Sequence, residues 1–301
     1  MKIVVAGASG LVGTALVPAL RAAGHDVHRL VRRTASLPDE IAWNPAAGVV
    51  DDARFADVEA VINLAGENVG AGRWTARRRE MILRSRVDGT RTLVEAMTRM
   101  KRKPAVLLNA SAVGCYGDRS DEVLTETSTA GRGFLPEVCR EWERHAAAAS
   151  PLGVRVACLR FGVVLAAQGG ALAKMLPLFR LGFGGRLGSG RQWMSWIGIE
   201  DAVRAIVHAV GEARLAGAVN VVAPEPVTNA EFTATLGRVL RRPAVLPVPA
   251  WVLRVALGQM ANEALLASQR ALPDALATAG FQFRHGTLES ALRVAFSMGK
   301  L

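Results

Sequence analysis

A glycine-rich loop directly after the first apolar segment constrains this chain most. A short apolar run at 2–6 is followed by GASGLVG at 7–13, and an amphipathic stretch covers 11–23. Gly7 permits a tight turn, Gly10 lets backbone amides approach a pyrophosphate, and Gly13 lets the helix lie close to the strand. The free amides and the dipole at the start of such a helix attract phosphate. This order predicts a dinucleotide site, the alternative being a merely tight turn between a strand and a helix.

Apolar and amphipathic segments alternate along the first two-thirds of the chain. Most of the apolar runs are continuous, which is typical of parallel strands covered on both faces. They predict strands at Lys2–Ala6, Asp26–Val31, Ala60–Leu64, Ala105–Ala110, Val154–Leu159 and Ala218–Val222, with helices near 11–23, 75–99, 136–149 and 199–212. The alternation predicts an α/β fold, a Rossmann-like doubly wound parallel sheet.

The pattern loosens after about residue 160. Residues 168–198 are rich in glycine around one helix near 171–180, and prolines recur beyond residue 223. We therefore expect a dinucleotide-binding domain over 1–165, completed by about 195–223, and a smaller, mostly helical lobe made of 166–194 and 224–301. The alternative is a helical tail that only completes the core.

Composition narrows the class of protein. The 301 residues carry a net charge of +11, but the arginines are scattered along the whole chain, so a nucleic-acid partner is disfavoured. No apolar stretch is long enough to cross a membrane, and we expect no membrane partner. The three cysteines cannot close a disulfide framework, and a cytoplasmic protein is expected. None of the five histidines stands at metal-ligand spacing, so no metal is predicted.

Two arginines end the second predicted strand. In a dinucleotide fold an acidic residue at this place binds the adenosine 2′-hydroxyl, whereas Arg32 and Arg33 stand here. Guanidinium groups pair with a phosphate dianion that a carboxylate would repel. The pair therefore favours NADP(H) over NAD(H), the alternative being two solvated surface arginines. Asn44 is a weaker candidate for the adenine rim, and Arg86 could reach a phosphate or the substrate.

The chain resembles the extended short-chain dehydrogenase/reductase superfamily, and within it an epimerase-family subgroup described as nucleoside-diphosphate-sugar epimerase or cell-division-inhibitor-like. The resemblance rests on six segments: the 7–13 loop, NLAG at 63–66, NASAVGCYG at 109–117, RFGVVL at 160–165, WMSWI at 193–197 and LPEVCREWE at 135–143. The resemblance spans essentially the whole chain and implies NADP(H) binding. With the residues above, it gives a cofactor set of Gly7, Ser9, Gly10, Leu11, Val12, Arg32, Arg33, Leu64, Ala65, Gly66, Arg86, Ser111, Arg160, Phe161 and Gly162.

The acid/base pair of that superfamily is missing. Its members use a tyrosine followed four residues later by a lysine, but this chain holds one tyrosine, Tyr116, and residue 120 is serine. Matching Glu143 to the family glutamate puts Leu135 in place of the tyrosine and Cys139 in place of the lysine. The remaining catalytic candidates are Ser111, Tyr116 and Cys139, followed by Glu141 and Glu67.

Three functions stay open. The first is an oxidoreductase or epimerase with relocated acid/base groups, acting on a carbonyl or sugar-nucleotide-like substrate. The second is a catalytically silent NADP(H) sensor or scaffold, and the third is a nucleic-acid binder. Residues that the resemblance places on the substrate side are Arg186, Arg191, Trp193 and Trp196. Equally, the two tryptophans could pack a junction between lobes while the two arginines are solvated. The helices near 75–99 and 136–149 suit a homodimer interface.

Overall fold

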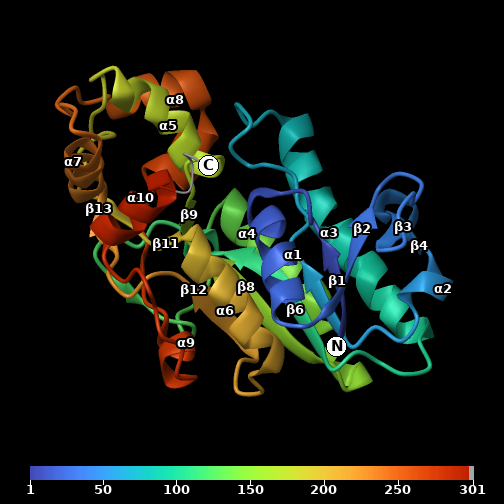
Figure 1. Cartoon of the computed structure of the whole chain (residues 1–301). Coiled ribbons are helices and arrows are strands. Elements are labelled where there is room, and N and C mark those ends of the chain that lie inside the picture. The colour runs from blue at the N-terminus through green and yellow to red at the C-terminus, as the bar shows by residue number, and fades with distance from the viewer. Residues whose placement is uncertain (298–301) are drawn as a thin grey trace.

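A computed structural model describes residues 1–297 and shows the predicted doubly wound sheet (Figure 1). Its eight strands lie in the order β12-β8-β6-β5-β1-β2-β3-β4, and all neighbours are parallel except β3 and β4. The strands are β1 (Lys2–Ala6), β2 (Asp26–Val31), β3 (Glu40–Asn44), β4 (Val49–Val50), β5 (Ala60–Asn63), β6 (Val106–Ala112), β8 (Arg155–Phe161) and β12 (Gly217–Val221). The direction of winding reverses between β1 and β5, where folds of this kind bind their ligands.

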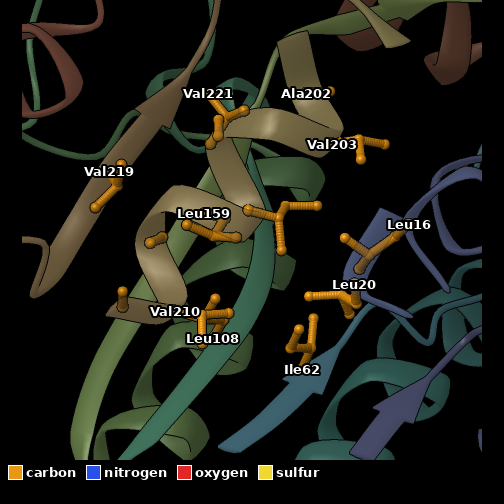
Figure 2. Close-up of a cluster of buried hydrophobic side chains, with 14 of the residues drawn as sticks. Leu16, Leu20, Ile62, Leu108, Leu159, Ala202, Val203, Val210, Val219 and Val221 are labelled. Carbon is orange, nitrogen blue, oxygen red and sulfur yellow. The ribbon is translucent and has the colours of Figure 1, made fainter. Parts of the chain in front are cut away.

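Helices cover both faces of the sheet. On one face pack α1 (Leu11–Ala22) and α6 (Ile199–Gly211), and on the other α3 (Ala76–Arg99) and α4 (Phe134–Ala147), with the short α2 (Asp52–Phe55) near the β4 edge. Successive residues of a strand serve opposite faces: Ile3 packs under α1 and Val4 under α3. Figure 2 shows Leu16 and Leu20 of α1 directed at the sheet, beside the α6 side chains.

A smaller lobe lies beside the β12 end of the sheet, toward the upper left of Figure 1. It contains α5 (Gly170–Arg180), α7 (Asn229–Leu240), α8 (Ala250–Leu257) and α10 (Leu288–Ser297), together with the short pairs β9 (Val163–Leu165)–β11 (Trp196–Gly198) and β10 (Trp193–Met194)–β13 (Val227–Thr228). Leu172, Phe179, Phe232 and Leu292 fill a separate apolar core. This lobe has the mostly helical character that the sequence predicts.

The last part of the chain crosses back to the large sheet. Strand β14 (Arg270–Ala271) pairs with β7 (Val123–Leu124), and α9 (Asp274–Thr278) packs on β12. Leu276 and Phe281 join the same core as α1 and α6. The predicted residue bounds of the two domains stay a prediction, and residues 298–301 of the predicted lobe lie outside the described residues.

The elements with predicted bounds match the structure, whereas the helices of the C-terminal third had no predicted bounds and several short strands were missed. All six predicted strands are present within two residues at each end, and so are the predicted helices. The missed strands include β3, which begins with a buried glutamate and holds only three apolar residues, and the two- and three-residue strands of the lobe. Within residues 1–297 no helix is long and apolar enough to cross a membrane.

Candidate functional site

The phosphate loop has the geometry that its glycines predict. Gly7 has a φ of +78°, and a Cβ there would lie 2.6 Å from the carbonyl carbon of Leu64. A Cβ on Gly13 would lie 2.2 Å from the oxygen of Gly7, so only glycine lets α1 pack this closely. Gly10 is the N-cap of α1, and no side chain there forms a capping hydrogen bond with the first amides of the helix. The start of α1 can therefore offer its amides to an anion.

A cavity of about 1290 Å³ opens over this loop. It lies at the carboxyl ends of β1, β2 and β5, where the winding of the sheet reverses. Its lining includes many predicted cofactor residues: Gly7, Ser9, Gly10, Arg32, Arg33, Leu64, Ala65 and Gly66, together with Asn44. The size and position suit an extended nucleotide.

The two arginines after β2 differ in their partners. Arg33 Nη1 donates to Glu40 Oε2 at 2.9 Å and its Nη2 to Glu40 Oε1 at 2.6 Å. Glu40 is buried, and its hydrogen bond from Arg33 lowers its pKa to about 2. Arg32 is exposed and has no ion pair among residues 1–297. Arg32 is therefore the free cation, whereas Arg33 is fixed by a carboxylate that sequence reasoning missed.

Arg86 lies beside Gly66 at the end of β5. Its Cζ is 3.1 Å from the place where a Cβ on Gly66 would stand, and 4.9 Å from the ring centroid of Trp142. Nη1 donates to the carbonyl oxygens of Glu67 and Ile82, each at 3.0 Å. Burial lowers the pKa of Arg86. The side chain thus reaches from α3 to the edge of the predicted cofactor path.

Ser111 belongs to a hydrogen-bonded group that joins β6, α4 and β8. Its Oγ donates to Glu143 Oε1 at 2.6 Å. Arg160 holds the same carboxylate through Nε at 2.9 Å and Nη2 at 2.8 Å. Burial is the largest single influence on Arg160 and disfavours its charge, but the hydrogen bond with Glu143 and the surrounding acidic groups together outweigh it and raise the pKa of Arg160. Arg160 is therefore held by the protein itself, and its contact with a cofactor stays a prediction.

Tyr116 is fully buried in the turn after β6. Its hydroxyl lies 2.7 Å from Asn220 Oδ1 and 2.9 Å from the oxygen of Thr125, and accepts from Arg160 Nη1 at 3.0 Å. Burial raises its pKa to about 12. With its hydroxyl occupied and hidden, Tyr116 fits a structural role better than the catalytic one considered from sequence.

Cys139 is also buried, on the side of α4 that faces the end of β6. Its Sγ lies 3.8 Å from the oxygen of Ala112, and burial raises the pKa of the thiol to about 11. A protonated, hidden thiol is a poor nucleophile and carries no charge. The other two candidates are paired, Glu67 with Arg78 at 2.9 Å and Glu141 with Arg144 at 2.8 Å.

Sequence reasoning missed Glu263. This residue lies in a π-helix (Ala261–Leu265), and its Oε2 accepts the amide of Leu135 at 2.8 Å. The carboxylate thereby ties the small lobe to the start of α4, at the place of the missing tyrosine. The sequence does single this residue out, because Glu263 is the only acidic residue between Glu231 and Asp274.

The predicted substrate residues divide into two kinds. Arg186 and Arg191 are exposed, and neither is ion-paired within the part of the chain that the structure describes. Trp196 is fully buried and donates its indole N–H to the oxygen of Glu225, so it offers no face to a ligand. Trp193 donates to Asp121 at 2.9 Å, and Arg270 lies 4.2 Å from its ring centroid. These contacts favour the junction role for both tryptophans.

Three predicted cofactor positions have structural explanations of their own. A Cβ on Gly162 would lie 2.5 Å from the oxygen of Ser195, which accounts for this glycine through packing. Leu11 contacts the Gly169–Gly170 turn, and Phe161 packs against the main core. Cofactor contacts of Leu11, Val12, Phe161 and Gly162 stay predictions. Among residues 1–297 no cluster of three or more metal-ligating side chains occurs.

Comparison with known sequences identifies related proteins over nearly the full length. A family model described as NAD dependent epimerase/dehydratase family matches residues 3–222, and a domain of unknown function, DUF1731, matches 248–295. Epimerase family protein Mb2239 of Mycobacterium bovis is 47% identical over 290 residues, which are 96% of each chain. Epimerase family protein YfhF of Bacillus subtilis is 37% identical over 97% of each chain.

Solved structures agree with these relationships. Human epimerase family protein SDR39U1, solved with NADPH, superposes with a TM-score of 0.90 at 33% identity and covers 99% of both chains. A nucleoside-diphosphate sugar epimerase from Corynebacterium glutamicum has a TM-score of 0.79 at 36% identity, over 97% of this chain and 57% of that one. With its glycine loop, its reversed winding and these matches, the chain belongs to the NAD dependent epimerase/dehydratase family.

Proposed function

We propose that this protein binds NADP(H) and acts as an oxidoreductase or epimerase on a carbonyl or sugar-nucleotide-like substrate. Two observations support the cofactor. The cavity over the phosphate loop has the position and size for a dinucleotide, and the human relative at 33% identity was solved with NADPH. When bound, this cofactor supplies or accepts a hydride.

The free cation at Arg32 is the single observation that carries the preference for NADP(H). Arg32 lines the cavity at the end of β2, and within residues 1–297 it has no carboxylate partner. Arg33 is held on the buried Glu40, so its guanidinium keeps a fixed place beside Arg32. A 2′-phosphate dianion would meet one free and one anchored guanidinium there.

The residues at the other end of the site would bind and orient a reacting oxygen. Ser111 is the hydroxyl at the carboxyl end of β6, and Glu143 fixes it through a short hydrogen bond. Arg160 holds the Glu143 carboxylate with two hydrogen bonds, so the Ser111 hydroxyl has an acceptor in a fixed place. General acid/base groups of this kind are commonly worth about 10²–10⁴-fold in rate. Ser111→Ala is expected to lower turnover without preventing NADPH binding.

Thermal unfolding in the presence of nucleotide tests the cofactor assignment. Wild type, Arg32→Ala and Arg99→Ala are compared with NADPH, NADH or no addition. Arg99 is a suitable control, since it is exposed, pairs with Asp52 and lies at the far end of α3. Ligand at 100 times its dissociation constant stabilises the fold by about 2.7 kcal/mol, which is a shift of several degrees. We expect that shift with NADPH in wild type and Arg99→Ala, and a much smaller one in Arg32→Ala. Absence of any NADPH shift in wild type would overturn the proposal.

A catalytically silent NADP(H) sensor is the second candidate. It is favoured by the buried Tyr116 and by the uncharged Cys139 thiol at the place of the missing lysine. NADPH oxidation with a panel of aldehydes, ketones and 4-keto sugar nucleotides separates the two candidates. Turnover that falls in Ser111→Ala supports the enzyme, and bound NADPH that never turns over supports the sensor.

The cytoplasmic location and the homodimer remain part of the proposal. Helices α3 and α4 pack against each other on one face of the sheet. The predicted dimer interface needs a continuous helical surface of this kind. Sedimentation of the purified chain at several concentrations would show whether it dimerises. A membrane or nucleic-acid partner forms no part of this proposal.

A further inference from the structure

Arg86 is a cation without an acidic partner. Within residues 1–297 no carboxylate lies within 4 Å of its guanidinium. The neighbouring Glu67 pairs instead with Arg78 at 2.9 Å. Only Nη1 has acceptors, and both are backbone carbonyls. A partly buried charge is costly to keep unless a partner compensates it. The arrangement therefore points to a ligand as the missing partner.

The position of the guanidinium indicates which part of a ligand it would meet. It lies against Gly66, shortly after β5, where the small residues Ala65 and Gly66 let a cofactor pass close to the backbone. Arg32 lines the opposite, adenosine end of the cavity that Gly66 also lines. Arg86 therefore stands beyond the phosphate loop from Arg32, on the side of Ser111 and α4.

Cys139 lies on α4, the helix that packs against α3, which carries Arg86. Burial raises the pKa of the Cys139 thiol, so this position of α4 carries no positive charge of its own. Trp142, one turn further along α4, packs under the guanidinium at 4.9 Å. The charge of Arg86 thus lies against α4, about one turn along from the position matched to the superfamily's lysine.

We propose that Arg86 supplies from α3 the fixed positive charge that the superfamily's lysine supplies from α4, and that it binds the nicotinamide half of NADP(H). The inference rests on the proposed NADP(H) function and names a positioning residue for it. The positive charge is then carried by a long arginine on α3, while the α4 position that holds a lysine in the superfamily is an uncharged cysteine. The hydroxyls of a ribose would accept from the Arg86 nitrogens that have no partner within the protein.

Two ligands of different length test this assignment. NADPH contains both halves of the cofactor, whereas 2′,5′-ADP contains only the adenosine half with its phosphates. In Arg86→Gln we expect the NADPH dissociation constant to rise about 10- to 100-fold, as loss of a charge-assisted hydrogen bond commonly produces. The constant for 2′,5′-ADP should stay within about twofold of wild type. Arg99→Gln, at the end of the same helix, should change neither constant.

A second variant asks whether the place of the charge is what matters. In Arg86→Gln/Cys139→Lys the cation returns to α4, and NADPH affinity should recover most of its loss. If the double variant does not fold, Arg86→Lys is measured in its place, because it keeps a positive charge on α3. Melting curves without ligand establish folding in every case.

The outcomes separate the two proposals. If wild type does not bind NADPH, the proposed function fails. If wild type binds NADPH but Arg86→Gln weakens both ligands equally, or neither, the assignment of Arg86 to the nicotinamide half is overturned while the proposed function stands.

Discussion

Glu143 and Arg160 form a two-point ion pair in which Nε meets Oε1 at 2.9 Å and Nη2 meets Oε2 at 2.8 Å. Glu143 comes from α4 and Arg160 from the end of β8, so the pair ties a helix to the sheet. Ser111 of β6 adds its hydroxyl to the same carboxylate. Three elements therefore depend on one acidic side chain.

Glu143→Gln is expected to destabilise the fold. The amide cannot accept both bonds from Arg160, which leaves a largely buried guanidinium without its counterion. Breaking a fully buried pair costs about 3–5 kcal/mol, and because both side chains keep some exposure we expect about 2–3 kcal/mol here. Urea unfolding measures the loss. Glu141→Gln, two residues away and 40% exposed, is the control and should cost under about 1 kcal/mol.

Glu40 predicts a stability that depends on acid pH. Its folded pKa is about 2, well below the ordinary value of 4.5, chiefly because Arg33 donates to it. A lowered carboxyl pKa contributes stability that is complete above the unfolded value and is lost as the pH falls through the folded one. The stability difference between wild type and Glu40→Gln should therefore be constant above about pH 5.5 and shrink steadily toward pH 2.

Denaturant unfolding at half-unit pH steps checks this expectation. Glu95→Gln, which also removes one carboxylate but from the exposed side of α3, serves as the control. A wild-type advantage over Glu40→Gln that does not change between pH 6 and pH 3 would contradict the role given to the Arg33 contact.

Tyr116→Phe should affect stability and leave cofactor binding intact. Removing the hydroxyl takes a donor from Asn220 and an acceptor from Arg160, both in a buried setting. Unsatisfied buried partners cost about 1–3 kcal/mol. We expect the melting temperature to fall by several degrees while the NADPH dissociation constant changes less than twofold. An unchanged melting temperature with abolished turnover would instead restore Tyr116 as a catalytic residue.

The cysteines are expected to be unreactive in the folded protein. All three are buried, and burial raises the pKa of Cys139 to about 11 and that of Cys158 to about 12. Thiolate is the reactive form, so almost none is present at pH 8. A chromogenic disulfide reagent should count all three thiols in denaturant and react only slowly without it. Rapid labelling of Cys139 in the native state would show a reactive, accessible thiol after all.

The fold was predictable because its signals are local. The glycine loop and the continuous apolar strands each lie within a dozen residues, and the structure confirms both. The difference between Arg32 and Arg33 was not predictable, since it depends on Glu40 in a neighbouring strand. Likewise Glu263 reaches Leu135 across 128 residues, a contact that only the packing of the two lobes creates.

Helix α9 packs on β12 of the large sheet although it follows most of the small lobe in the chain. A gene that stopped after β12 would lose Leu276 and Phe281 from the main core, and the remaining nucleotide-binding part would expose that apolar surface to water. The C-terminal segment is therefore no exchangeable module. Chimaeras that graft it between relatives must carry the matching α6 surface with it, or they will aggregate.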